Sequence, residues 1–336
     1  MASFDEVLKD CTKLGTKIPT SEYLENGKYP IIDRGQNDIA GYYDSDEGLF
    51  EDVPTIVFGD HTRVVKYVDK PCFLGADGVK LLCPVDKDIN CKYLFYQLSY
   101  ADIPNTGYNR HFKWVKALDF KIPSSDKQNH VVEVLDKVTE LISLRKQQLA
   151  KLDELVKARF VEMFGNKDYP RMKWNNVFNT TTGKLDSNAA VANGKYPFFT
   201  CSKEPLKIDS YAFDQTALLL AGNNAAGKYD VKYYQGKFNA YQRTYVLSLK
   251  HNWSYKLFQY QLEDKLLYLQ TKSLGGLTKY LTLKILGELD FIVPPLALQN
   301  EFAAFVEHVD EQKQTVQQSL EKLELMKKAL MQEYFG

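Results

Sequence analysis

Cysteine is scarce in this chain, and its spacing is unfavourable for cross-links or metal binding. Among 336 residues there are five cysteines, and no two of them form a C-x-x-C pair. An odd number without paired spacing argues against a disulfide framework or a zinc site and favours buried thiols in a reducing compartment. The five are Cys11, Cys72, Cys83, Cys91 and Cys201.

The sequence also has no long apolar run and no excess of one charge. Its apolar stretches fall short of the roughly 18 residues that a membrane span needs, and its polar, acidic start does not resemble a signal peptide. We therefore expect a soluble cytoplasmic protein without membrane attachment. The 43 basic residues balance the 43 acidic ones. Any phosphate-binding surface must then arise from local segregation of charge.

Motifs of the common nucleic-acid enzymes are missing. An adenine methyltransferase needs an Asn/Asp-Pro-Pro-aromatic motif, but Pro294-Pro295 is preceded by Val293 and followed by Leu296. There is no G-x-x-x-x-G-K-[ST] loop for ATP and no H-E-x-x-H metal motif. The glycines at 275 and 276 lack the strand and helix that would frame a dinucleotide loop. We expect no catalytic site, no metal and no cofactor in this chain.

What the sequence does contain is an internal repeat. The stretch from Leu118 to Gly165 returns without a gap, 171 residues later, as Leu289 to Gly336. A repeat that fills each half of a chain predicts a pseudo-symmetric molecule, and such symmetry suits the reading of two DNA half-sites. The matched anchors are Leu118-Asp119-Phe120 with Leu289-Asp290-Phe291, Pro123 with Pro294, Gln128-Asn129 with Gln299-Asn300, and Phe164-Gly165 with Phe335-Gly336.

The repeat continues into the globular parts and sets the expected domains. Asn26-Gly27-Lys28-Tyr29-Pro30 returns as Asn193-Gly194-Lys195-Tyr196-Pro197. Short apolar runs bounded by turn residues predict strands, including 55–58, 79–82, 217–220 and 245–249, with helices near 92–100 and 255–270. We expect a mixed α+β fold with two pseudo-symmetric globular domains, 1–123 and 166–294, separated by helices over 124–165 and 295–336.

The two helical segments carry apolar stripes. Leu135, Ile142, Leu149 and Val156 keep a strict seven-residue step, which is typical of a coiled coil. A chain with two-fold symmetry would pair the two helices antiparallel. An unbroken helix over 126–163 would measure about 57 Å, enough to hold two reading domains one duplex turn, roughly 34–36 Å, apart. We interpret the stripes as a structural spacer.

Polar loops recur at matching positions in the two halves and supply the candidate DNA-binding residues. Arginine pairs with guanine and Asn or Gln with adenine, while Lys and Thr hold phosphates. Any single loop residue is more often just solvated, so the recurrence of the set is what supports the assignment. The candidates are Lys17, Arg34, Arg63, Asn109, Arg110 and Lys113 in the first half, and Lys184, Asn223, Gln242, Arg243 and Lys279 in the second.

Together these motifs resemble the specificity subunits of type I restriction–modification enzymes. The resemblance covers essentially the whole chain, and the order and duplication of the motifs are more specific than any one of them. The carriers are L-D-F-x-x-P at 118–123 and 289–294, P-P-L-x-x-Q-N at 294–300, G-K-L-D at 183–186, and the Asn-Gly-Lys-Tyr-Pro strand entries. Gln-Asn at 128–129 and 299–300 departs from the Glu-Gln of many relatives, which leaves partner specificity open.

The resemblance implies a non-catalytic subunit whose two target recognition domains each read half of a bipartite DNA sequence. It implies as partners double-stranded DNA, two modification (methyltransferase) subunits and restriction/translocase subunits. S-adenosylmethionine, Mg²⁺ and ATP would then be used only by those partners. Because the loops of the two halves differ, we expect an asymmetric target. Two alternatives remain open: a self-sufficient DNA methyltransferase or nuclease, and a coiled-coil adaptor that binds no DNA.

Overall fold

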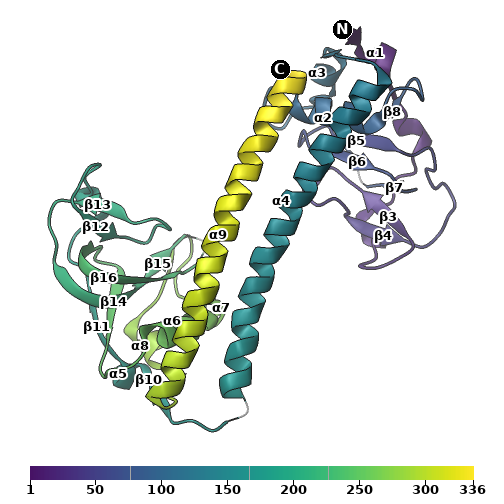
Figure 1. Ribbon diagram of the computed structural model, residues 1–336. Coiled ribbons are helices and arrows are strands. Elements are labelled where there is room, and N and C mark those ends of the chain that lie inside the picture. The colour runs from purple at the N-terminus through teal and green to yellow at the C-terminus, as the bar shows by residue number, and fades with distance from the viewer. Residues whose placement is uncertain (76, 166, 226) are drawn as a thin grey trace. The chain divides into compact units, whose positions relative to one another are not determined.

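Two units share the long helices in the computed structural model (Figure 1). The structure describes residues 1–75, 77–165, 167–225 and 227–336. Unit 1 comprises Met1–Gln147 and Gln317–Gly336, and unit 2 comprises Gln148–Val316. This division follows packing, so that each unit contains part of both long helices. The boundaries expected at 123, 165 and 294 remain a prediction about the separable parts of the chain.

Unit 1 is built on a four-stranded sheet of order β2-β8-β5-β6, beside a three-stranded sheet of order β4-β3-β7. In the second sheet β3 pairs with β7 in parallel. The helices are α1 (Phe4–Val7), α2 (Cys91–Tyr100) and α3 (Phe112–Lys116). The strands are β1 (Ala2–Ser3), β2 (Leu8–Asp10), β3 (Tyr29–Ile32), β4 (Gly41–Tyr43), β5 (Thr55–Gly59), β6 (Val65–Val68), β7 (Phe73–Leu74), β8 (Val79–Pro84) and β9 (Asp119–Phe120).

Unit 2 repeats this order of elements around a six-stranded sheet, β11-β17-β14-β16-β12-β13. The long strand β16 pairs antiparallel with β14 and in parallel with β12. It therefore occupies the positions that two strands, β6 and β7, occupy in unit 1. The helices are α5 (Trp174–Val177), α6 (Tyr255–Asp264), α7 (Leu266–Lys272) and α8 (Leu283–Gly287). The strands are β10 (Arg171–Lys173), β11 (Phe178–Thr182), β12 (Tyr196–Phe199), β13 (Leu206–Ile208), β14 (Phe213–Ala221), β15 (Asn223–Asn224), β16 (Val231–Ala240), β17 (Thr244–Leu249), β18 (Lys279–Tyr280) and β19 (Asp290–Ile292).

The central strands are apolar on both faces because both faces of each sheet are covered. In β5, Ile56 and Phe58 join the cluster beneath α1, α2 and α3, whereas Val57 joins a second cluster on the opposite face. In β14, Leu218 and Leu220 face α6 and α8, whereas Leu219 packs with Phe199 and Phe238. The strands predicted at 55–58, 79–82, 217–220 and 245–249 are therefore confirmed.

Two long helices follow the globular parts: α4 (Ser125–Phe160), extended by a π-helical turn over Val161–Gly165, and α9 (Leu296–Phe335). Figure 1 shows α9 running alongside α4. In unit 1 the start of α4 packs on the end of α9, and in unit 2 the end of α4 packs on the start of α9, so the pairing is antiparallel, as predicted. The contacts join Val131 and Leu135 with Met331 and Phe335, and Leu152 and Val156 with Phe302 and Val306.

One helix differs from its prediction. The segment expected as one helix over 255–270 forms α6 and α7, which meet at Lys265. Lys265 has φ −90° and ψ −3°, outside the geometry of a regular α-helix. Both Leu262 of α6 and Leu269 of α7 are fully buried in the same core, so tertiary packing favours the break.

Candidate nucleic-acid interface

In unit 1 the buried residue Asp60 forms hydrogen bonds that connect three loops. Asp60 follows β5, and its backbone N–H donates to the carbonyl of Gly78 at 2.7 Å. Its own carbonyl accepts a hydrogen bond from the N–H of His111 at 2.8 Å. Its carboxylate Oδ1 accepts another from the N–H of Phe112 at 2.7 Å. Because Asp60 is only 4% exposed, these bonds are shielded from water and hold the loops firmly.

His111 holds the loop over 105–110 in place through hydrogen bonds of its buried ring. Its ring is fully buried, and Nδ1 lies 3.0 Å from the carbonyl oxygen of Asp60. A carbonyl can only accept, so Nδ1 carries the proton and Nε2 is an acceptor. Accordingly, the N–H of Thr106 donates to Nε2 at 3.3 Å. A neutral histidine thus joins the first residues of the loop to the turn after β5.

Three of the predicted cations gather around Asp77, in the turn that leads into β8. Lys17 Nζ forms an ion pair with Asp77 Oδ1 at 2.7 Å. The hydrogen bond and charge of Lys17 lower the pKa of Asp77, and the charges of Arg110 and Arg34 lower it further. Gly78 has φ 88°, and a Cβ atom there would lie 3.0 Å from Nη1 of Arg34. Residues far apart in the sequence therefore form one local, positively charged surface.

An aromatic pair stands beside these cations. The rings of His61 and Tyr108 are stacked, with centroids 4.8 Å apart and an angle of 9° between planes. His61 Nδ1 lies 3.2 Å from the carbonyl oxygen of Asn109 and donates to it. We name these residues the unit 1 loop surface: Lys17, Arg34, His61, Asp77, Tyr108, Asn109 and Arg110.

Two further candidates in unit 1 have local partners. Nη1 of Arg63 donates to the carbonyl of Ile103 at 3.0 Å, and the Arg63 backbone has the left-handed φ of 61°. This bond gives Arg63 a structural part in fastening the chain after α2. Lys113 lies exposed on α3, with its ammonium 5.3 Å from the ring centre of Trp114.

Unit 2 has the same backbone frame with different side chains. Gly222 follows β14, its N–H donates to the carbonyl of Arg243 at 2.8 Å, and its carbonyl accepts from the N–H of Leu281 at 2.8 Å. A Cβ atom at Gly222 would lie 2.3 Å from the Arg243 oxygen, so glycine is needed there. Gly222 corresponds to Asp60, and the polar side-chain lock of unit 1 is replaced by close backbone contact.

The five candidates of unit 2 lie on the loops joined by this frame. Gln242 donates through Nε2 to Asp186 Oδ2 at 3.1 Å and through its N–H to the carbonyl of Leu185 at 2.9 Å, next to the exposed Lys184. Asn223 follows Gly222 directly, and β15 pairs with β18, which contains Lys279. We name these residues the unit 2 loop surface: Lys184, Asp186, Asn223, Gln242, Arg243 and Lys279.

The anchoring residues and Asp77 have no signature in the sequence. Asp60 and His111 lie within the predicted loops, but no local pattern distinguishes a buried aspartate or histidine from an exposed one. Asp77 and Asp186 are acidic, whereas the side chains expected to contact DNA are cations and amides. Their ion pair and hydrogen bond depend on contacts between residues 60 and 56 positions apart in the chain.

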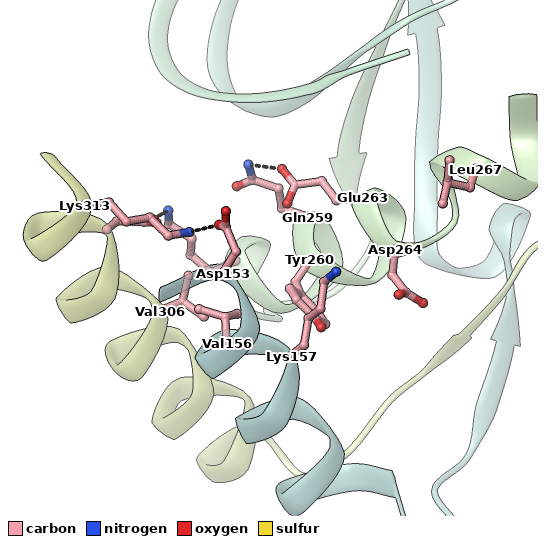
Figure 2. Close-up of a pocket in the computed structure, with 12 residues that line it drawn as sticks. Asp153, Val156, Lys157, Gln259, Tyr260, Glu263, Asp264, Leu267, Val306 and Lys313 are labelled. Carbon is pink, nitrogen blue, oxygen red and sulfur yellow. Dashed lines mark hydrogen bonds and ion pairs between the residues drawn. The ribbon is translucent and has the colours of Figure 1, made fainter. Parts of the chain in front are cut away.

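One pocket of unit 2 is not part of these surfaces. The pocket has a volume of about 520 Å³ and is lined by residues of α4, α6, α7 and α9, as Figure 2 illustrates. Several of its polar groups have partners within the pocket: Lys313 pairs with Asp153 at 2.6 Å and Lys256 with Asp310 at 2.7 Å, and Gln259 Nε2 donates to Glu263 Oε1 at 2.9 Å. Burial, with the nearby charge of Asp264, raises the pKa of Tyr260 to about 12, so its hydroxyl stays protonated at neutral pH. These paired groups belong to the packing of helices.

Two negative findings apply to the described residues. Outside positions 76, 166 and 226, no group of three or more His, Cys, Asp or Glu side chains is arranged to hold a metal ion. In the same part of the chain, no helix is both long and apolar enough to cross a membrane.

Solved structures share this architecture. The S subunit of a type I restriction–modification system from M. genitalium aligns over 99% of this chain and 95% of its own, with a TM-score of 0.61 and 18% identity. A chain from a study of complex assembly and conformational transition of the type I R-M system aligns over 98% and 94%, with a TM-score of 0.51 and 14% identity. At these identities the comparison shows the fold.

Sequence comparisons agree with the fold. The EcoDI specificity subunit of Escherichia coli is 51% identical over 80 residues, covering 24% of this chain and 17% of that protein. The EcoR124I/EcoR124II specificity subunit of Escherichia coli is 24% identical over 151 residues, covering 39% and 37%. Each alignment thus spans well under half of the curated relative. A family model described as the type I restriction modification DNA specificity domain matches twice, over residues 5–154 and 166–325. The chain therefore belongs to the family of type I restriction–modification DNA specificity proteins.

Proposed function

We propose that this chain is the DNA-recognition subunit of a type I restriction–modification complex. One observation carries the proposal: the same three-way backbone frame, at Asp60 and at Gly222, presents cationic and amide side chains in both units. Arginine, lysine, asparagine and glutamine are the residues that read base edges and hold phosphates. A frame that recurs with different side chains is suited to reading two different half-sites.

The partners follow from the family. Double-stranded DNA is the ligand of the loop surfaces, and two modification subunits and the restriction/translocase subunits bind the chain. Chemistry belongs to those partners, which use S-adenosylmethionine, Mg²⁺ and ATP, whereas this chain has no catalytic role and needs no cofactor. The complex works in the cytoplasm, where the DNA lies.

The test replaces one arginine on each loop surface. Arg110→Ala and Arg243→Ala, each in complex with the modification subunit, should weaken DNA binding. Each should also reduce, by about one, the steepness with which the logarithm of the binding constant falls with the logarithm of the salt concentration. Selection from randomised DNA should show that each variant relaxes a different half-site. Matched controls are Lys87→Ala and Lys250→Ala, exposed lysines beyond the opposite ends of β8 and β17, which should leave selection unchanged.

Three results would contradict the proposal. Sequence-independent binding by the unchanged complex would favour an adaptor without recognition. A palindromic selected target would contradict two different readers. Methyl transfer or cleavage by the purified chain alone would show that it is an enzyme in its own right.

A further inference from the structure

Each unit carries one loop that rises from the backbone frame and ends in an exposed apolar side chain. In unit 1 the loop over 105–110 leads to His111, and in unit 2 the loop over 273–279 leads to Leu281. Tyr108 is 81% exposed and Leu277 is 94% exposed. We name Tyr108 and Leu277 the tip residues. Their occurrence at equivalent places in both units indicates a shared purpose, since an isolated exposed apolar side chain would have no reason to recur there.

The tip of unit 1 is supported from behind. The Tyr108 ring stacks on His61, which is itself held by the carbonyl of Asn109 at 3.2 Å. Gly107, with φ 78°, makes the sharp turn that brings Tyr108 to the surface. An aromatic ring with a stacked partner and an anchored loop resists being pushed back.

The tip of unit 2 is supported by its backbone. Leu274 and Tyr280 exchange two hydrogen bonds, of 3.0 and 2.8 Å, which close a short hairpin. Gly275 has φ 99°, and a Cβ atom there would lie 2.3 Å from the carbonyl oxygen of Thr278, so the turn is tight. Leu277 lies at its end.

The surroundings of both tips fit DNA better than protein. Two residues after each tip comes a cation, Arg110 after Tyr108 and Lys279 after Leu277. Tyr108 also shares its surface with Lys17 and Arg34 around Asp77. Apolar side chains among cations are how DNA-bending proteins place a wedge between base pairs while basic groups hold the flanking phosphates.

We propose that Tyr108 and Leu277 are wedge residues, each entering one base step of its half-site and partly unstacking it. This inference rests on the proposed DNA-recognition function. It assigns the tip residues a task that differs from base-edge reading: they select steps that separate easily, such as pyrimidine–purine steps, by the energy of deformation. Separation of a step also lowers the cost of moving a base out of the stack nearby.

The experiment uses the chain in complex with its modification subunit and target DNA containing 2-aminopurine, whose fluorescence rises when it is unstacked. The reporter is moved along each half-site, at positions other than the methylated adenine. With the unchanged complex, the 2-aminopurine fluorescence should rise at one base step in each half-site. Tyr108→Ala should abolish the signal in one half-site and Leu277→Ala in the other. Each should weaken binding about tenfold, the usual loss when a stacking side chain is cut to alanine.

Conservative and distant variants provide the controls. Tyr108→Phe and Leu277→Met keep an apolar wedge and should keep the signal. Val85→Ala and Leu267→Ala remove exposed apolar side chains, 49% and 77% exposed, from places outside the loop surfaces and should change neither signal nor binding.

The outcomes separate the two proposals. Sequence-specific binding without a brightened step, or a step that stays bright in Tyr108→Ala and Leu277→Ala, overturns the wedge and leaves the recognition function standing. Absence of sequence-specific binding by the unchanged complex overturns both. Loss of the modification subunit from Tyr108→Ala or Leu277→Ala, with DNA binding retained, would assign the tips to protein contact and also overturns the wedge.

Discussion

Single buried glutamines join each globular region to the long helix that follows it. Gln128 and Gln299 are 2% and 1% exposed. Gln128 bonds the N-cap residue of α2 and the proline that lies two residues before α4. Gln299 makes the same two bonds to the N-cap residue of α6 and the proline before α9. Gln128 Oε1 accepts from Asn90 N at 2.9 Å and Nε2 donates to Pro123 O at 2.8 Å; Gln299 Oε1 accepts from Ser254 N at 3.0 Å and Nε2 donates to Pro294 O at 2.8 Å.

A second pair of glutamines, Gln97 and Gln261, also bonds backbone groups at equivalent positions of the two units. The amide of Gln97 donates to the carbonyl of Lys121 at 3.1 Å and accepts from its N–H at 2.7 Å. Gln261 makes the matching bonds to Ile292, at 3.1 and 2.8 Å. These glutamines are retained in both units because each satisfies backbone groups that burial removes from water.

Removal of one such amide should be costly. Gln299→Leu leaves the buried carbonyl of Pro294 and the half-buried N–H of Ser254 without their partner. The unpaired carbonyl should lower the free energy of unfolding by about 1–3 kcal/mol, and the N–H should add less because water can reach it in part. Urea unfolding followed by fluorescence measures this. Asn300→Ala, at the exposed neighbouring position, is the control and should change it little. Equal midpoints for the two variants would show that the buried amide contributes nothing.

The cysteines should differ in reactivity according to burial. Burial raises the pKa of Cys72, Cys83 and Cys91 to about 12, and thiolates are the reactive form. At pH 8 an alkylating reagent should therefore modify these three only after unfolding. Cys201 is partly exposed and its Sγ lies 3.7 Å from the carbonyl oxygen of Arg243, on the edge of the unit 2 loop surface.

Cys201 should therefore be modified first, and target DNA should slow its modification. Mass spectrometry of alkylated peptides gives both rates, with DNA of unrelated sequence as the control. Equal labelling of Cys201 with target and unrelated DNA would contradict the position of the unit 2 loop surface at the interface.

At the scale of elements, the loops are positioned by the sheets beneath them. β5 and β14 end directly before Asp60 and Gly222, and the adjacent β8 and β17 begin directly after Gly78 and Arg243. Hydrogen bonds across these strand ends bring loops from distant parts of the sequence together. The sheet thus sets where the loops lie, whereas the loop sequence sets which side chains they present.

Loosening of the anchor should impair recognition without removing any DNA-contacting side chain. Asp60→Ala removes the carboxylate that accepts from Phe112 N–H, so the loop over 105–110 should exchange its amide hydrogens faster and be cut sooner by protease. Binding to target DNA should weaken by about tenfold, since a bond to a charged group contributes about 1.5–3 kcal/mol. Asp60→Asn keeps the accepting oxygen and should restore most of the affinity. Unchanged exchange in Asp60→Ala would contradict the anchoring role.

At the scale of the whole molecule, both long helices continue from one unit into the other. α4 begins in unit 1 and ends in unit 2, and α9 does the reverse. The heptad stripe is buried at Leu135 and Val156 and half-buried at Ile142 and Leu149. Because the helices connect the two readers, their length should determine which half-site spacings the protein accepts.

Shortening both helices by one heptad should shorten the preferred spacer. Deletion of the seven residues between Leu141 and Leu149, with the seven between Gln312 and Leu320, removes about 10.5 Å of helix and keeps its phase within about 20°. At 3.4 Å per base pair, the selected spacer should fall by about three base pairs. Deletion from α4 alone is the control, since it places the two stripes out of register and should lower stability. An unchanged spacer in the double deletion would refute the helices as its determinant.

Much of the fold was predictable because its signals are local. The apolar runs at 55–58 and 217–220 and the seven-residue stripe from Leu135 depend on periodicity within one element. The break at Lys265 and the parallel pairing of β12 with β16 were not predicted, since they depend on packing against distant residues. The loops of the candidate site were predicted as a set, but the structural bond of Arg63 to Ile103 was not.

The sequence by itself determined the repeat, the two helical stripes, the family and the loops that differ between the halves. Each of these is written in residue order and spacing. Only the tertiary structure decided that Lys17, Arg34 and Arg110 share one surface in unit 1. The same holds for the anchors, Asp60 in unit 1 and Gly222 in unit 2, and for the exposed tips, Tyr108 in unit 1 and Leu277 in unit 2. The reason is physical: hydrogen bonds and burial between residues far apart in the chain depend on sheet register and packing, which no local pattern specifies.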